Sequence, residues 1–154
     1  MHKAWDSAAA ERVLSAFAST QDQLLPMLHA LQAEFGWIAD EATPLLAATL
    51  NLSRAEVHGT ISFYHDFRRE PAGKVVVKLC RAEACQAMGG ERTAAALLQR
   101  LGIGWSETTK DGAITVEAVY CLGLCAAAPA ALIGETPAAR LDGQSLIAQV
   151  EALR

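Results

Sequence analysis

The four cysteines of the chain form two closely spaced pairs in its second half. Cys80 and Cys85 are separated by four residues, Cys121 and Cys125 by three, and 35 residues lie between the pairs. Thiols grouped in this way indicate either one shared metal site or two disulfides. Four thiolates are the ligand set of a structural zinc ion and also of a [2Fe–2S] cluster.

The spacing within each pair favours iron and sulfide over zinc. Structural zinc sites often separate their paired cysteines by two residues, whereas the loops here contain four and three. A two-iron cluster is wider than one ion, so it accommodates wider loops. The pattern also differs from the plant-type ferredoxin spacing. We therefore interpret the pairs as a [2Fe–2S] site of another ferredoxin class, with electron transfer as its chemistry.

Other interpretations of the cysteines stay open at this point. These alternatives are buried reduced core thiols, two disulfides, a zinc site and a dithiol redox centre. Two tight pairs argue against chance placement in a core, and the absence of a C-x-x-C motif argues against a dithiol oxidoreductase. Disulfides are rare in the cytoplasm, and the N-terminal sequence described below favours a cytoplasmic protein.

Composition and charge limit the setting of the chain. Its 154 residues suffice for one medium domain or two small ones, and its net charge is −4. Without a run of Lys and Arg, we expect no nucleic acid partner. The apolar runs are too short to cross a bilayer, so we expect no membrane association of the chain by itself. Asp6, Glu11 and Arg12 stand where a signal peptide needs an apolar stretch, which favours a cytoplasmic protein.

Residues 1–70 are predicted to form an N-terminal helical bundle. Apolar residues recur at helical spacing, or follow helix-start signals, in four segments: 8–17, 24–35, 40–50 and 53–61. Asp40 is placed to cap the third helix. Ser53 and Glu56 form a capping box for the fourth. Short connections between these helices are typical of a bundle.

Residues 71–154 are predicted to form a second domain with a different pattern. Runs rich in β-branched residues predict strands over 74–79 and 114–120, and each leads directly into a cysteine pair. Further strands are expected at 130–133 and 138–141, and helices at 91–101 and 144–153, the last capped by Asp142. This order resembles a thioredoxin-like α/β fold. The fold class is therefore α+β, a helical bundle followed by a thioredoxin-like [2Fe–2S] domain.

The two strands that precede the cysteines suggest how the pairs meet. If the strands are neighbours in one sheet, Cys80 and Cys121 emerge at the same edge, and the two loops close over one cluster. Gly123 is expected to adopt a positive φ or to let the backbone approach a sulfur. Loop N–H groups are expected to donate hydrogen bonds to the sulfurs. Arg81 and Gln86 flank the first pair and are candidate side-chain donors.

These motifs resemble a known family. The runs Cys80-x4-Cys85 and Cys121-x-Gly-x-Cys125-Ala-Ala-Ala-Pro129, together with the run VHGTISFY that begins at Val57, are similar to the thioredoxin-like [2Fe–2S] ferredoxin subunit of NADH dehydrogenases. That family includes the small iron–sulfur subunit of respiratory complex I and counterparts in NAD-linked hydrogenases and formate dehydrogenases. The resemblance implies that all four cysteines hold one [2Fe–2S] cluster.

Within the family, the runs CRAEACQ (80–86) and FYHDF (63–67) most resemble the gamma subunit of NAD-dependent molybdenum formate dehydrogenase. This resemblance implies a non-catalytic one-electron carrier beside a flavin- and NAD-binding subunit, with a separate molybdenum and iron–sulfur subunit that oxidises formate. The equivalent subunit of complex I or of an NAD-linked hydrogenase is the alternative. A structural zinc-binding interaction module is the alternative of another class. For an all-cysteine cluster in an acidic chain we expect a reduction potential well below zero.

Overall fold

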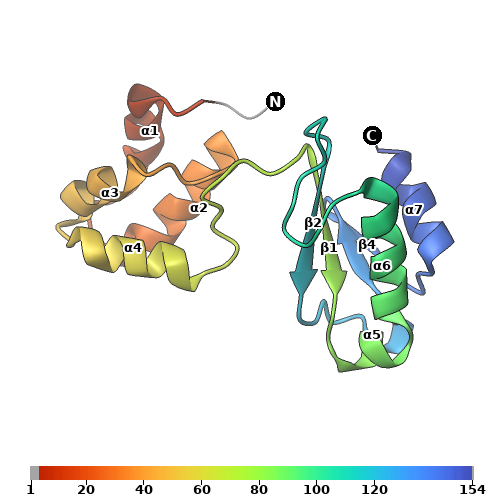
Figure 1. Ribbon diagram of the computed structural model, residues 1–154. Helices are drawn as coiled ribbons and strands as arrows, with labels where there is room; N and C mark the ends of the chain where they lie inside the picture. Colours follow the sequence, from red (N-terminus) through yellow and green to blue (C-terminus); the bar gives the residue numbers. More distant parts are fainter. Residues whose placement is uncertain (1–3, 154) are drawn as a thin grey trace. The chain divides into compact units, whose positions relative to one another are not determined.

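The computed structural model describes residues 4–153 and divides the chain into two compact units, Met1–Pro71 and Ala72–Arg154 (Figure 1). The described part of the first unit is built from helices, and the second combines a four-stranded sheet with helices. The predicted α+β class is therefore confirmed. The assignment of residues 1–70 and 71–154 to two domains stays a prediction.

The first unit contains α-helices of eight to twelve residues and one 3₁₀ turn: α1 (Ser7–Leu14), η1 (Gln21–Gln23), α2 (Leu24–Phe35), α3 (Ala42–Leu50) and α4 (Arg54–Phe63). The capping box predicted for the fourth helix is present. The Glu56 N–H donates to the Ser53 hydroxyl at 3.2 Å, and the Ser53 N–H donates to the Glu56 carboxylate at 2.8 Å. These two bonds satisfy N–H groups that have no partner within the helix.

Two details of the helical prediction are wrong. The first helix ends at Leu14 and does not reach Phe17, whose N–H instead closes a turn onto the Leu14 carbonyl at 3.0 Å. Asp40 does not cap the third helix; its carboxylate forms an ion pair with Arg69. That helix begins after Glu41, without a side-chain cap.

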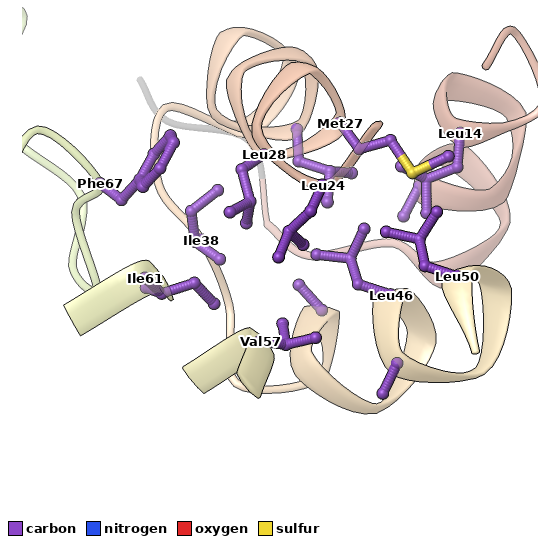
Figure 2. Close-up of a cluster of buried hydrophobic side chains, with 14 of the residues drawn as sticks. Leu14, Leu24, Met27, Leu28, Ile38, Leu46, Leu50, Val57, Ile61 and Phe67 are labelled. Atoms are coloured by element: carbon purple, nitrogen blue, oxygen red, sulfur yellow. The ribbon is translucent and has the colours of Figure 1, made fainter. Parts of the chain in front are cut away.

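The core of the first unit is a single cluster of buried side chains. Figure 2 shows members from all four helices and from the segments that connect and follow them: Leu14, Leu24, Met27, Leu28, Ile38, Leu46, Leu50, Val57, Ile61 and Phe67. Burial of this apolar surface is the main force that holds short helices of this kind together.

The second unit is organised around a sheet with strand order β2-β1-β3-β4. Its strands are β1 (Val75–Cys80), β2 (Ile114–Val119), β3 (Ala131–Ile133) and β4 (Thr136–Ala138). β1 and β2 are parallel, and the other neighbours are antiparallel. The helical elements of the unit are α5 (Glu83–Ala87), α6 (Gly90–Leu101), η2 (Cys125–Ala127) and α7 (Gly143–Glu151).

Helices α6 and α7 lie side by side and cover the sheet (Figure 1). Strand residues such as Val77 and Val116 share one buried cluster with Leu97 of α6 and Leu146 of α7. Asp142 caps α7 as predicted, accepting the Ser145 N–H at 2.7 Å. Within the part of the chain that the structure describes, no helix combines the length and the apolar character that a membrane crossing requires.

The structure corrects two parts of the prediction for this unit. The fourth strand is Thr136–Ala138, not 138–141. It contains Pro137, which has no N–H to donate and is tolerated because β4 lies at the edge of the sheet. The short helix α5, inside the first cysteine loop, was not predicted at all. Its five residues are too few to produce a periodic pattern.

Candidate metal centre

The parallel pairing of β1 and β2 brings the two cysteine loops to the same edge of the sheet, as predicted. Cys80, the last residue of β1, is in register with Val119, the last residue of β2. The pairing continues one residue further, since the Arg81 N–H donates to the Val119 carbonyl at 2.8 Å. On its other side the Cys80 N–H donates to the Ala130 carbonyl at 3.1 Å. Cys80 is therefore held between two neighbouring segments of the sheet.

The first pair of thiols is buried. α5 turns the chain back after Cys80, and the Gln86 side chain closes the loop by donating to the Arg81 carbonyl at 2.7 Å. Cys80 is 6% exposed and Cys85 is 2% exposed, and both pack against Ala128 and Ala130. These two thiols are therefore shielded from bulk water.

The second pair lies at the surface on a tight loop. Cys121 has φ 98° and Gly123 has φ 75°, so the predicted positive φ at Gly123 is confirmed. The Gly123 N–H donates to the Cys121 sulfur at 3.4 Å, which is a loop N–H–sulfur bond of the predicted kind. Cys125 opens η2, and its sulfur lies 3.7 Å from that of Cys121. Both thiols of this pair are exposed.

Electrostatic coupling of the thiols connects the two loops. Burial opposes ionisation of Cys80, but hydrogen bonds from the Ala82 backbone, the Cys85 thiol and the backbone of the second loop outweigh it and lower its pKa. Burial, followed by the bond with Cys80, raises the pKa of Cys85. The bond with Cys121, followed by its charge and by burial, raises the pKa of Cys125, and the charge of Cys80 adds to this. The thiols of one loop therefore shift the pKa values of thiols in the other loop.

The donor set fits a [2Fe–2S] cluster. All four cysteines are free, so the structure contains neither of the two disulfides considered above. The sulfurs stand as two pairs, Cys80 with Cys85 and Cys121 with Cys125. Two pairs of thiolates suit two metal atoms better than a single ion.

One expectation for the surroundings of the site is wrong. The side chains of Arg81 and Gln86 do not donate to sulfur: Arg81 donates to Glu91 at 2.8 Å, and Gln86 donates to the Arg81 carbonyl. The sequence pattern also gave no sign of Glu91 and Trp105 as neighbours of the first loop, because these contacts join residues that lie far apart in the chain. The Ala128–Pro129 peptide bond, whose isomer the sequence leaves undecided, is cis.

Known proteins with similar sequences are subunits of NADH- and NADP-linked oxidoreductases. The chain is 33% identical over 124 residues to an NADH-quinone oxidoreductase subunit of Mycobacterium tuberculosis, which covers 80% of the chain and 49% of that protein. It is 31% identical to the NADP-reducing hydrogenase subunit HndA of Solidesulfovibrio fructosivorans, covering 75% of the chain and 67% of the subunit. The chain thus spans about half the length of its mycobacterial relative.

A solved structure gives the same result. A chain of an NAD⁺-reducing [NiFe]-hydrogenase in the air-oxidised state superposes with a TM-score of 0.71 at 28% identity, covering 87% of this chain and 24% of that one. The sequence profile of the thioredoxin-like [2Fe-2S] ferredoxins matches residues 10–154, which include both cysteine pairs. The chain therefore belongs to the thioredoxin-like [2Fe-2S] ferredoxin family, whose cofactor is a [2Fe–2S] cluster.

Proposed function

We propose that the chain is a one-electron transfer subunit in which Cys80, Cys85, Cys121 and Cys125 hold the cluster. The observation that supports this best is the meeting of four free thiols, in two pairs, at the ends of neighbouring parallel strands. When bound, a [2Fe–2S] cluster accepts and returns one electron. The protein contributes the thiolate ligands, the N–H donors around them and the exclusion of water from the buried pair.

The difference in burial between the two cysteine pairs indicates on which side electrons reach the cluster. Cys80 and Cys85 face the interior, whereas Cys121 and Cys125 are exposed. Tyr120, directly before the second pair, is 72% exposed. We propose that electrons enter and leave on the side of the Cys121–Cys125 loop, where a partner's redox group can approach closest.

A flavin- and NAD-binding subunit is the proposed partner. The relatives described above are named as subunits of NADH- and NADP-linked oxidoreductases. Neither a G-x-G-x-x-G motif nor a P-loop occurs in this sequence, so hydride chemistry would belong to another chain. Phe63 and Tyr64, exposed at 73% and 43%, give the helical unit an apolar patch suited to such a contact. The cytoplasm, where thiols stay reduced, is the proposed compartment.

Formate is the proposed electron donor of the complex. The support is the resemblance of the runs CRAEACQ and FYHDF to the gamma subunit of NAD-dependent molybdenum formate dehydrogenase. A molybdenum and iron–sulfur catalytic subunit would then be a further partner. The equivalent position in complex I or in an NAD-linked hydrogenase is the second candidate, since relatives of both kinds match the chain.

Isolation of the native complex tests this proposal. The full chain would be tagged in its source organism and purified under low oxygen, and the co-purifying subunits identified by mass spectrometry. We expect a flavin- and NAD-binding subunit and a molybdenum subunit. We also expect both NADH and formate to reduce the cluster, so that the electron paramagnetic resonance signal of the reduced cluster appears. A nickel-containing or quinone-linked complex that ignores formate would replace formate dehydrogenase by the second candidate. A chain that holds zinc and no iron would overturn electron transfer itself.

A further inference from the structure

The exposed cysteine pair places two thiols close enough to react with each other. The sulfurs of Cys121 and Cys125 lie 3.7 Å apart, and both residues are exposed. A disulfide requires a sulfur–sulfur distance of about 2.05 Å. Because neither side chain is buried, rotation about the Cα–Cβ bonds can bring the sulfurs together without repacking a core. This pair is therefore a candidate site of reversible oxidation.

The backbone around the exposed pair keeps the two sulfurs near each other. The Gly123 N–H donates to the Cys121 sulfur at 3.4 Å, which holds that sulfur over its own loop. Hydrogen bonds anchor the loop to neighbouring segments at both ends, through the Val119 carbonyl before it and the Ala127 carbonyl after it. Closing a ring of so few residues costs little chain entropy. The loop is thus prepared for a bond between its own two cysteines.

The buried cysteine pair is shielded from the same reaction. Cys80 and Cys85 are both buried in a cluster of side chains that includes Ala128 and Ala130. An oxidant must reach a sulfur to react with it, so the exposed thiols are the first that it meets. Oxidation of the chain should therefore select Cys121 over the buried thiols.

We propose that Cys121 and Cys125 form a disulfide when a peroxide reaches the chain before it holds a cluster, and that this disulfide prevents cluster assembly until a dithiol reductant opens it. The first half of this inference requires only the two thiols, whereas the second half rests on the proposed cluster function. The cytoplasm is compatible with such a bond, because the disulfides that do occur there are usually transient and redox-sensing.

The oxidation is balanced in two steps. One thiol attacks hydrogen peroxide, so that an S–O bond forms, the O–O bond breaks and one water leaves. The second thiol attacks the resulting sulfenic sulfur, so that the S–S bond forms, the S–O bond breaks and a second water leaves. The peroxide takes up two electrons, one from each sulfur. A dithiol reverses the change by exchange and is itself oxidised to a disulfide.

The disulfide removes half of the ligand set. Thiolates, not disulfide sulfurs, bind the metal, so only Cys80 and Cys85 would stay available in the oxidised chain. With two of the four ligands lost, the chain should take up little iron. Once the cluster is bound, its iron occupies the same sulfurs, so the holo chain should resist formation of the disulfide.

Peptide mapping identifies the disulfide directly. The full chain, freed of metal and reductant, would be treated with one equivalent of hydrogen peroxide, alkylated in denaturant and digested with trypsin. Trypsin cleaves after Lys110 and Arg140, and no Lys or Arg lies between them, so one peptide carries both Cys121 and Cys125. We expect the peptide 111–140 to be lighter by two hydrogen atoms and free of alkyl groups. The chain should lose two of its four free thiols.

The same digest identifies the other possible pairings. Trypsin also cleaves after Arg81, so Cys80 and Cys85 fall on different peptides. A disulfide within the buried pair would therefore link two peptides, and a disulfide between the loops would link one of them to the peptide 111–140. Either product as the main outcome, or four thiols that stay free, would overturn the assignment.

Two cysteine variants form a matched pair for this experiment. Cys121→Ser removes one partner, so no disulfide should form within the peptide 111–140. Cys85→Ser removes a buried thiol and keeps both exposed ones, so the disulfide should form as in the unaltered chain, although this variant is expected to bind no cluster. An oxidised Cys85→Ser chain with free thiols at 121 and 125 would contradict selection by exposure.

Cluster uptake tests the second half of the inference. The oxidised and reduced chains would each receive a [2Fe–2S] cluster from a loaded scaffold protein, without free sulfide, because sulfide can itself open disulfides. We expect the reduced chain to take up iron, the oxidised chain to take up little, and a dithiol to restore uptake. Equal uptake by both chains would overturn the block. A reduced chain that takes up no iron would instead refute the proposed function, and the peptide map would still decide whether the disulfide forms.

Discussion

Replacing Cys85 by serine is expected to abolish the cluster, reducing iron from about two atoms per chain to a small fraction of that. Cys85 is 2% exposed and belongs to the same cluster of buried side chains as Cys80. The serine oxygen is a harder and shorter ligand than a thiolate and binds iron–sulfur clusters poorly. With one of four ligands lost at this buried position, water cannot readily take its place. Iron and acid-labile sulfide assays on the reconstituted chain measure the effect.

Met88→Ala is the matched control for Cys85→Ser. Met88 lies three residues further along the same loop and is 64% exposed, so its truncation removes apolar surface without removing a ligand. We expect this variant to keep its full iron content. Far-ultraviolet circular dichroism of both variants shows whether the fold is intact. A folded Cys85→Ser chain with unchanged iron, sulfide and visible spectrum would remove Cys85 from the ligand set.

Replacing Gly90 by alanine is expected to destabilise the second unit and weaken cluster retention. A Cβ at this position would lie 2.6 Å from the Cys85 carbonyl oxygen and 3.1 Å from its carbonyl carbon. Both are backbone atoms, so no side-chain rotation relieves the overlap, and α5 must move away from α6. Overpacking of this kind costs about 1–3 kcal/mol, and here the displaced residue is a cluster ligand. Thermal unfolding and iron content measure the two effects.

Gly59→Ala provides the control for Gly90→Ala. Gly59 lies within α4, and a Cβ there would meet no atom within 4 Å. Alanine removes the conformational freedom that glycine brings to a helix interior, so this substitution should stabilise the chain by about 0.5–1 kcal/mol. Iron content should not change. If Gly90→Ala behaved like Gly59→Ala in both measurements, the close contact between α6 and the Cys85 backbone would not constrain the site.

The cysteine site could be anticipated from sequence because it depends on local signals. Each pair follows a strand rich in β-branched residues, and two such strands in one sheet bring their ends together. The parallel register of Cys80 with Val119 confirms this reasoning. The positive φ of Gly123 could be predicted for a similar reason, since a glycine inside a three-residue loop often adopts a positive φ. The ligand roles of the four cysteines stay a prediction.

The contacts around the site could not be anticipated, because they depend on tertiary structure. Arg81 meets Glu91 and Trp105, ten and twenty-four residues away, only after α6 and the following loop pack beside β1. Asp40 had the local signature of a helix cap, but its carboxylate is taken by Arg69, which lies 29 residues away. The helix also begins one residue later than this signature requires, at Ala42, so that Glu41 stands at the cap position.

The most direct test of the cluster assignment is a visible absorption spectrum of the purified chain, with iron and sulfide assays, recorded during a redox titration with dithionite. We expect about two irons and two sulfides per chain, absorption bands that bleach on uptake of one electron, and a midpoint potential well below zero. A colourless chain that contains one zinc ion would contradict the assignment. It would make the four cysteines a structural zinc site on a ferredoxin-like fold.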